Sequence, residues 1–147
     1  MKRNLPESRG DIMFNPDKTN PKDLLGVKKV PVNLIPPVAI IQEAMAMKFG
    51  AYLTKRADGT TGYGPYNWRE GQIQLSIYLA AIMRHWLAYL DGEDLASDSG
   101  IHHLAHIRAG CGIVLDAIAN GNLIDDRPTK GKASQLLEAF KEVNEQS

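Results

Sequence analysis

The sequence predicts an all-α protein, a helical bundle built on a central antiparallel helix hairpin with an extended N-terminal arm. In the central segments, apolar residues recur every three or four positions, as is typical of helices with one buried face. No segment shows a convincing strand pattern, and no internal repeat is present. Proline and polar residues dominate the start of the chain. We therefore expect an arm over residues 1–37 that wraps a helical domain over residues 38–147.

Composition narrows the class of protein. The 147 residues suffice for one domain with a core, and seventeen basic residues balance seventeen acidic ones. This balance points to neither a nucleic-acid partner nor a membrane partner. The single cysteine, Cys111, favours a reducing compartment, and its helical apolar setting predicts a buried small residue. Because no apolar run reaches membrane-spanning length, we expect a cytoplasmic protein.

The first part of the helical domain is a helix followed by a glycine-rich loop. Residues 38–49 carry an apolar stripe, and the prolines at positions 36 and 37 mark where this helix begins. Residues 50–67 contain four glycines and indicate a mobile loop. The loop lacks the glycine spacing of known phosphate-binding motifs.

Two long helices form the predicted hairpin, and a short amphipathic helix over residues 133–143 closes the chain. The first long helix begins at Trp68 or Gly71 and ends at Leu90, where Asp91-Gly92 stops it. The second runs over residues 100–119, with Asp98 or Ser99 as its N-cap and Asn120-Gly121 as its end.

All four histidines of the chain lie between positions 84 and 106, together with several carboxylates. His85 and Glu93 fall on one helical face, and Asp98 and His106 fall on one face of the next helix. Such a pair of faces can supply oxygen ligands to a hard divalent cation and imidazoles for proton transfer. The alternative is structural: His85 caps the core, Glu93 is a solvated helix end and Asp98 is only an N-cap. No zinc motif of the HExxH type is present.

A second polar cluster lies at residues 63–70, where two tyrosines, Asn67, Trp68 and Arg69 adjoin the glycine loop. These groups can stack on a base and hold a phosphate. The structural alternative is a helix entry anchored by Trp68 in the core. Lys22, in the arm, is either solvated or close enough to reach a polyphosphate.

In this order along the chain, several motifs resemble those of phage-type dATP/dGTP diphosphohydrolases, a family related in function to the MazG-like all-α nucleotide pyrophosphohydrolases. The motifs are Asn20-Pro21-Lys22-Asp23, Gly26-Val27-Lys28-Lys29-Val30-Pro31, Pro36-Pro37, Tyr63-Gly64-Pro65-Tyr66-Asn67-Trp68-Arg69-Glu70, Arg84-His85, Gly92-Glu93-Asp94, Asp98-Ser99-Gly100 and His103-Leu104-Ala105-His106. The resemblance spans residues 18–128. It implies cleavage of a purine deoxynucleoside triphosphate (dGTP or dATP) to the monophosphate and pyrophosphate, with Mg²⁺ or Mn²⁺. It also implies a homo-oligomer of phage origin, acting in the host cytoplasm.

The chain departs from that family in two places. Members usually carry a compact Gly-Ala-Lys-Lys-Tyr-Gly motif, whereas here residues 52–62 separate Gly50-Ala51 from Tyr63-Gly64. Lys55 and Arg56 lie within this insertion. Within the span of the resemblance, the ExxE and ExxD carboxylate pairs of MazG-like enzymes are also not present as such.

Taken together, these observations lead us to expect metal-assisted attack of water on a triphosphate. The expected roles are the following: metal ligands Glu43, Glu93 and Asp98; proton-transfer groups His85 and His103; phosphate contacts Lys22, Arg69 and Arg84; base contacts Asn67 and Trp68. One alternative is a phage protein that binds and sequesters a nucleotide without turnover. Another is a helical interaction protein. Hydrolysis of the HD type is disfavoured because no adjacent His-Asp pair occurs.

Overall fold

The computed structural model describes residues 20–145 and divides the chain into two compact units, Met1–Pro36 and Pro37–Ser147. The described part of the first unit contains a short helix, α1 (Pro21–Gly26), and a 3₁₀ turn, η2 (Val32–Leu34). The Asn20 side chain caps α1 by accepting a hydrogen bond from the Lys22 backbone N–H at 2.9 Å. The segment predicted to be extended is therefore partly helical. Residues 1–19 of the predicted arm lie outside the described residues.

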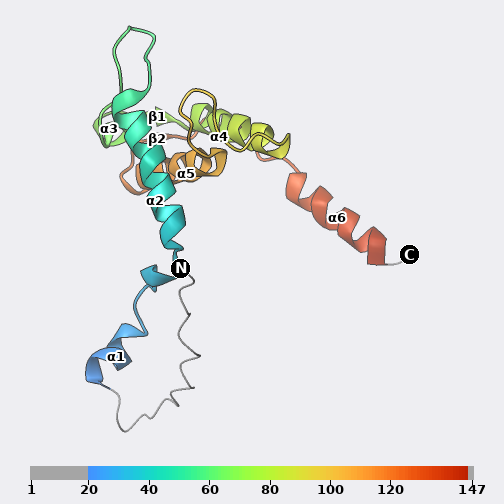
Figure 1. The fold of residues 1–147 in the computed structure, drawn as a ribbon. Coiled ribbons are helices and arrows are strands. Elements are labelled where there is room, and N and C mark those ends of the chain that lie inside the picture. The colour runs from blue at the N-terminus through green and yellow to red at the C-terminus, as the bar shows by residue number, and fades with distance from the viewer. Residues whose placement is uncertain (1–19, 146–147) are drawn as a thin grey trace, which may run out of the picture. The chain divides into compact units, whose positions relative to one another are not determined.

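The second unit is mainly helical, as the sequence predicts (Figure 1). Its elements in chain order are α2 (Pro37–Lys48), the π-helix η3 (Phe49–Leu53), α3 (Asn67–Glu70), β1 (Ile73–Gln74), α4 (Leu75–Leu90), α5 (His103–Ala119), β2 (Leu123–Ile124) and α6 (Ala133–Glu145). Pro37 occupies the first position of α2, where a missing backbone N–H costs nothing. No helix within residues 20–145 is both long enough and apolar enough to span a membrane.

A two-stranded parallel sheet corrects the expectation that no strand is present. Ile73 in β1 pairs with Leu123 in β2, and the Ile73 backbone N–H donates to the Asn122 carbonyl at 2.9 Å. Each strand has two residues, which is too short for alternating polarity to show in the sequence. The sheet holds the start of α4 next to the end of α5.

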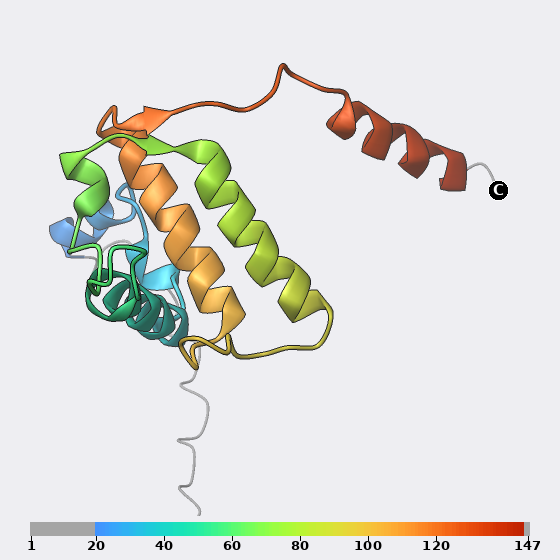
Figure 2. The ribbon, with the colours of Figure 1, turned by 90° about the horizontal axis from the view of Figure 1, so that it is seen from above.

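Helices α4 and α5 pack side by side, and residues 91–102 connect them (Figure 2). A Cβ atom at Gly110 would lie 2.9 Å from Ile82 Cγ1, so glycine is what permits this close approach. Helix α2 packs against α5, where Ala46, Ala105 and Ala109 form the buried core cluster. Small side chains at these positions let the helix backbones approach closely.

The helix ends agree with the sequence at some positions and differ at others. Gly92, with φ +99°, follows the C-cap of α4 as predicted, and Asn120 is the C-cap of α5. The predicted cap at Asp98 or Ser99 is wrong. His102 is the N-cap of α5 because its Nδ1 accepts a hydrogen bond from the Leu104 backbone N–H at 3.1 Å.

Two further expectations for these helices are wrong. The predicted helix from 68 or 71 to 90 is interrupted: α3 ends at Glu70, and β1 intervenes before α4 begins at Leu75. Cys111 is exposed rather than buried. Its neighbour Gly110 faces α4, and a helix turns by about 100° per residue, so the next side chain points elsewhere.

Candidate functional site

The inserted segment 52–62 returns to the point where it leaves the main body. The Tyr63 backbone N–H donates to the Gly50 carbonyl, and the Gly64 N–H donates to the Ala51 carbonyl, both at 3.0 Å. Within the insertion, Lys55 and Thr61 form an antiparallel bridge. The loop therefore brings the two halves of the interrupted glycine motif side by side in space.

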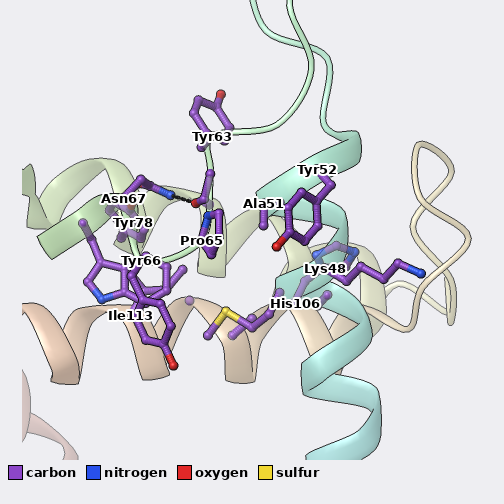
Figure 3. Close-up of a pocket in the computed structure, with 18 of the residues that line it drawn as sticks. Lys48, Ala51, Tyr52, Tyr63, Pro65, Tyr66, Asn67, Tyr78, His106 and Ile113 are labelled. Atoms are coloured by element: carbon purple, nitrogen blue, oxygen red, sulfur yellow. Dashed lines mark hydrogen bonds between the residues drawn. The ribbon is translucent and has the colours of Figure 1, made fainter. Parts of the chain in front are cut away.

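A cavity of about 660 Å³ opens beside this junction, between α2, α4, α5 and the segment that leads into α3. Its walls are largely apolar and aromatic, and they include Met47, Tyr52, Tyr66, Trp68, Tyr78 and Ile113. In Figure 3, Tyr66 lies beside Ile113 of α5 and Tyr52 lies near His106, on either side of Pro65. A cavity of this size and character suits a small organic ligand.

Trp68 and Arg69, two predicted substrate contacts, are held by Asp116 of α5. The buried Trp68 donates its Nε1–H to Asp116 Oδ2 at 2.6 Å. Arg69 donates from Nε and from Nη2 to the same carboxylate, at 2.7 Å each. These hydrogen bonds, the one from Arg69 first, lower the pKa of Asp116 to about 2. The Arg69 guanidinium is thus engaged in a bidentate ion pair.

Asn67, the other predicted base contact, also supports the loop. Its Nδ2 donates to the Gly64 carbonyl at 2.9 Å, the hydrogen bond drawn in Figure 3. The side chain lines the cavity while it fixes the turn that begins at Gly64.

Histidines 85 and 106 line the cavity on its α4 and α5 sides. Their rings stack with centroids 4.5 Å apart, and Ser99 Oγ lies 2.8 Å from His106 Nε2. Burial is the first cause that lowers the pKa of His85, followed by the nearby His106 and His103; burial also lowers the pKa of His106. Both imidazoles are therefore neutral near pH 7.

His103 contacts His85 but does not line the cavity. The Nδ1 atoms of His85 and His103 are 2.8 Å apart, so one of them carries a proton and donates it to the other. His103 is buried, and its Nε2 has no hydrogen-bond partner, although Glu93 Oε1 lies 3.4 Å away. Glu93 and Asp98 both belong to the connection between α4 and α5 rather than to the helices. The structure thus gathers His85, His103 and Glu93 into one cluster.

The other predicted site residues are placed as follows. Burial lowers the pKa of both His85 and His106, the charge of Asp98 partly opposes that lowering, and the exposed Arg84 adds to it at His85. Glu43 in α2 accepts a hydrogen bond from Arg108 Nη2 at 2.8 Å. Lys22 follows the first residue of α1 and belongs to the first unit.

The described residues do not provide a metal site made of protein ligands alone. Between residues 20 and 145, no group of three or more His, Cys, Asp or Glu side chains is arranged to hold a metal ion. Glu43 is paired with Arg108, and Glu93 lies beside His103. A cation at this site would need further ligands from a substrate.

Sequence reasoning missed two residues of the site. Asp116 lies 47 positions after Arg69, and no local motif marks it. Lys48, at the end of α2, lines the cavity and extends outward from it in Figure 3. Lys55 and Arg56 of the insertion do not line the cavity, and Arg56 pairs with Asp58 at 3.2 Å.

Comparison with known proteins gives one match. A family model described as dATP/dGTP diphosphohydrolase, N-terminal, matches residues 19–127. This span includes every element from α1 to β2 and leaves α6 outside. No curated protein and no solved structure matches the chain.

Proposed function

Because the chain belongs to the dATP/dGTP diphosphohydrolase family, matched over its N-terminal region, we propose that it hydrolyses a purine deoxynucleoside triphosphate to the monophosphate and pyrophosphate. The observation that carries this proposal is the cavity, in which aromatic walls adjoin two neutral imidazoles. The aromatic part suits a base, and the imidazoles suit proton transfer.

The base would occupy the part of the cavity lined by Tyr66, Trp68 and Ile113. Purine rings are flat and largely apolar on their faces, so they gain by stacking on aromatic side chains. The triphosphate would then extend toward the imidazoles. Lys48 and Arg84 are the cations that we assign to it.

In the chemical step, a water molecule attacks the α-phosphorus of the substrate. A bond forms between the water oxygen and phosphorus, and the bond from phosphorus to the bridging oxygen of pyrophosphate breaks. We assign the water's proton to Nε2 of His85, because Nδ1 of His85 already shares a hydrogen bond with Nδ1 of His103. His103 fixes the orientation of the His85 ring.

We also propose that Mg²⁺ or Mn²⁺ accompanies the substrate. Mg²⁺ is commonly held by one or two carboxylates together with substrate phosphates, and Glu93 and Asp98 are carboxylates that interact with the histidines. A divalent cation offsets phosphate charge during hydrolysis. The ion pair with Arg108 makes Glu43 the least suited of the three predicted ligands.

The test is a panel of the four deoxynucleoside triphosphates with Mg²⁺ or Mn²⁺, assayed for monophosphate and pyrophosphate. We expect dGTP and dATP to be cleaved, and His85→Asn to lower kcat by about 100-fold or more, the usual effect of losing a general base. The matched control is His102→Asn, which removes an imidazole outside the cavity and keeps a good N-cap for α5. Its kcat should stay within a few-fold of that of the unchanged protein.

Two results would overturn this function. Nucleotides that raise Tm without any release of pyrophosphate would identify a sequestering protein. If no nucleotide raises Tm at all, the result would favour the other alternative, a helical interaction protein.

A further inference from the structure

Tyr66 has a backbone conformation that tyrosine rarely adopts. Its φ of 56° and ψ of 25° lie in the left-handed region, and it is the one residue other than glycine with positive φ among residues 20–145. Nothing about the start of α3 requires tyrosine here, because Tyr66 is the N-cap and its side chain makes no capping hydrogen bond. Glycine or asparagine would occupy this position with less strain. Such strain is maintained where the surrounding structure imposes it, and it gathers at ligand sites.

Burial of the ring does not account for this choice of residue. Tyr66 is 57% exposed, yet it lines the cavity. Its ring contacts are with two residues that follow it closely: the Arg69 guanidinium lies 4.7 Å from the ring centroid, and the Trp68 ring lies 5.3 Å away. The Tyr66 ring is therefore supported by two side chains of the same segment, while the Tyr66 side chain as a whole remains accessible.

Asp116 fixes both of these supporting side chains. Its two carboxylate oxygens receive three hydrogen bonds, one from Trp68 and two from Arg69. Asn122 secures the backbone of the same segment, since its Nδ2 donates to the carbonyls of Trp68 and Arg69 at 3.1 and 2.8 Å. The support of Tyr66 is thus attached to α5 and to a residue just after its end.

We propose that Tyr66 is the base-stacking residue that selects purines, and that Asp116 is a positioning residue that holds Trp68 and Arg69 so that the Tyr66 ring faces the ligand. A purine offers a larger stacking surface than a pyrimidine, so a fixed aromatic ring favours it. Arg69 then serves the ring rather than a phosphate. This inference rests on the proposed function for its ligand class, a deoxynucleotide.

The experiment compares two substitutions at Tyr66. Tyr66→Phe keeps the ring, whereas Tyr66→Gly removes the ring and relieves the backbone, so loss of folding does not confuse the result. Binding of dGTP and dCTP analogues with a non-hydrolysable α,β-imido bridge is measured by calorimetry, and KM and kcat are measured with the natural nucleotides. We expect Tyr66→Gly to raise Kd and KM for the purine at least 10-fold, to change those for the pyrimidine less, and to leave kcat within a few-fold. Tyr66→Phe should retain the selectivity.

The role of Asp116 is tested by Asp116→Asn, alone and combined with Tyr66→Gly. If Asp116 acts through the ring, its substitution raises the purine Kd when Tyr66 is present and adds little once Tyr66→Gly has removed the ring. Asp125→Asn is the matched control, because Asp125 also accepts two hydrogen bonds from one arginine side chain, Arg127, and lies outside the cavity lining. It should leave Kd unchanged.

The outcomes separate this inference from the proposed function. Purine hydrolysis with an unchanged purine Kd in Tyr66→Gly would overturn the inference alone. Selective, Tyr66-dependent binding without hydrolysis would support the inference and overturn the proposed function. Full additivity of Asp116→Asn and Tyr66→Gly would overturn the positioning role of Asp116. Absence of any nucleotide binding would overturn both proposals.

Discussion

Two glycines in the inserted loop share a left-handed backbone but meet different surroundings. Gly59, with φ +81°, faces open space. Gly62, with φ +73°, would place a Cβ atom 2.2 Å from the Ala51 carbonyl oxygen. Because that oxygen also accepts the Gly64 N–H, the contact lies at the junction that closes the loop.

Gly62→Ala should therefore destabilise the protein more than Gly59→Ala. We expect Gly62→Ala to lower the free energy of unfolding by about 2–5 kcal/mol, from left-handed strain of about 1–2 kcal/mol and overpacking of about 1–3 kcal/mol. Gly59→Ala should lower the free energy of unfolding only by the left-handed strain, because a Cβ atom there meets no other atom. Urea unfolding of both variants measures the difference, and equal losses would show that the contact with Ala51 has no effect.

The buried histidines predict a pH dependence of stability. The pKa values of His85 and His106 lie below their ordinary 6.5 in the folded protein. As pH falls below 6.5, the unfolded chain takes up protons that the folded protein resists, so the free energy of unfolding falls. The loss ends once pH passes below the lowered values, and above 6.5 this contribution is constant.

We expect urea unfolding between about pH 8 and about pH 5 to show this loss, and His85→Asn to make it shallower. His102→Asn again serves as the control, because His102 does not line the cavity. Its pH profile should match that of the unchanged protein. Identical pH profiles for His85→Asn and the unchanged protein would contradict this account.

At the scale of elements, local periodicity predicted the helices but not the interactions between distant segments. The apolar spacing located α2, α4, α5 and α6 to within a few residues. It could not reveal β1, because the partner of Ile73 is Leu123, fifty positions later. For the same reason, the apolar spacing predicted that α4 begins at Trp68 or Gly71. Pairing between β1 and β2 keeps residues 73–74 out of the helix, which begins at Leu75.

The candidate site shows the same limit. The clustering of histidines and carboxylates identified the connection between α4 and α5, and the structure brings His85, His103 and Glu93 together there. The assignment of Arg69 to phosphate did not anticipate Asp116, since an ion pair between α3 and α5 leaves no trace in local spacing. The N-cap at His102 was missed because imidazole is not among the usual capping groups.

At the scale of the whole molecule, α4 leaves several large apolar side chains uncovered. Trp86, Leu87 and Leu90 are 51%, 58% and 71% exposed. Contiguous apolar surface of this kind commonly marks a protein interface. It supports the proposal, made from the family resemblance, that the protein is a homo-oligomer.

Light scattering should accordingly give a mass of at least two 16.2 kDa chains. We expect Leu87→Glu and Leu90→Glu to reduce that mass, because a charge on this face cannot be buried without a partner. Leu25→Glu, at a residue of the first unit that is 64% exposed, is the control and should leave the mass unchanged. A monomer of the unchanged protein at micromolar concentration would contradict the proposal.

The closed base of the inserted loop separates the length of residues 55–61 from the cavity beside it, because the cavity lining includes Tyr52 and Tyr63 but no residue between them. Hydrogen bonds from Tyr63 and Gly64 to Gly50 and Ala51 hold this base together. Lengthening a loop whose ends are already joined adds little closure entropy, about 0.6 kcal/mol for each doubling. The tip of this loop is consequently a suitable place to insert a fluorescent reporter or an affinity tag in the middle of the chain while the ligand cavity keeps its shape.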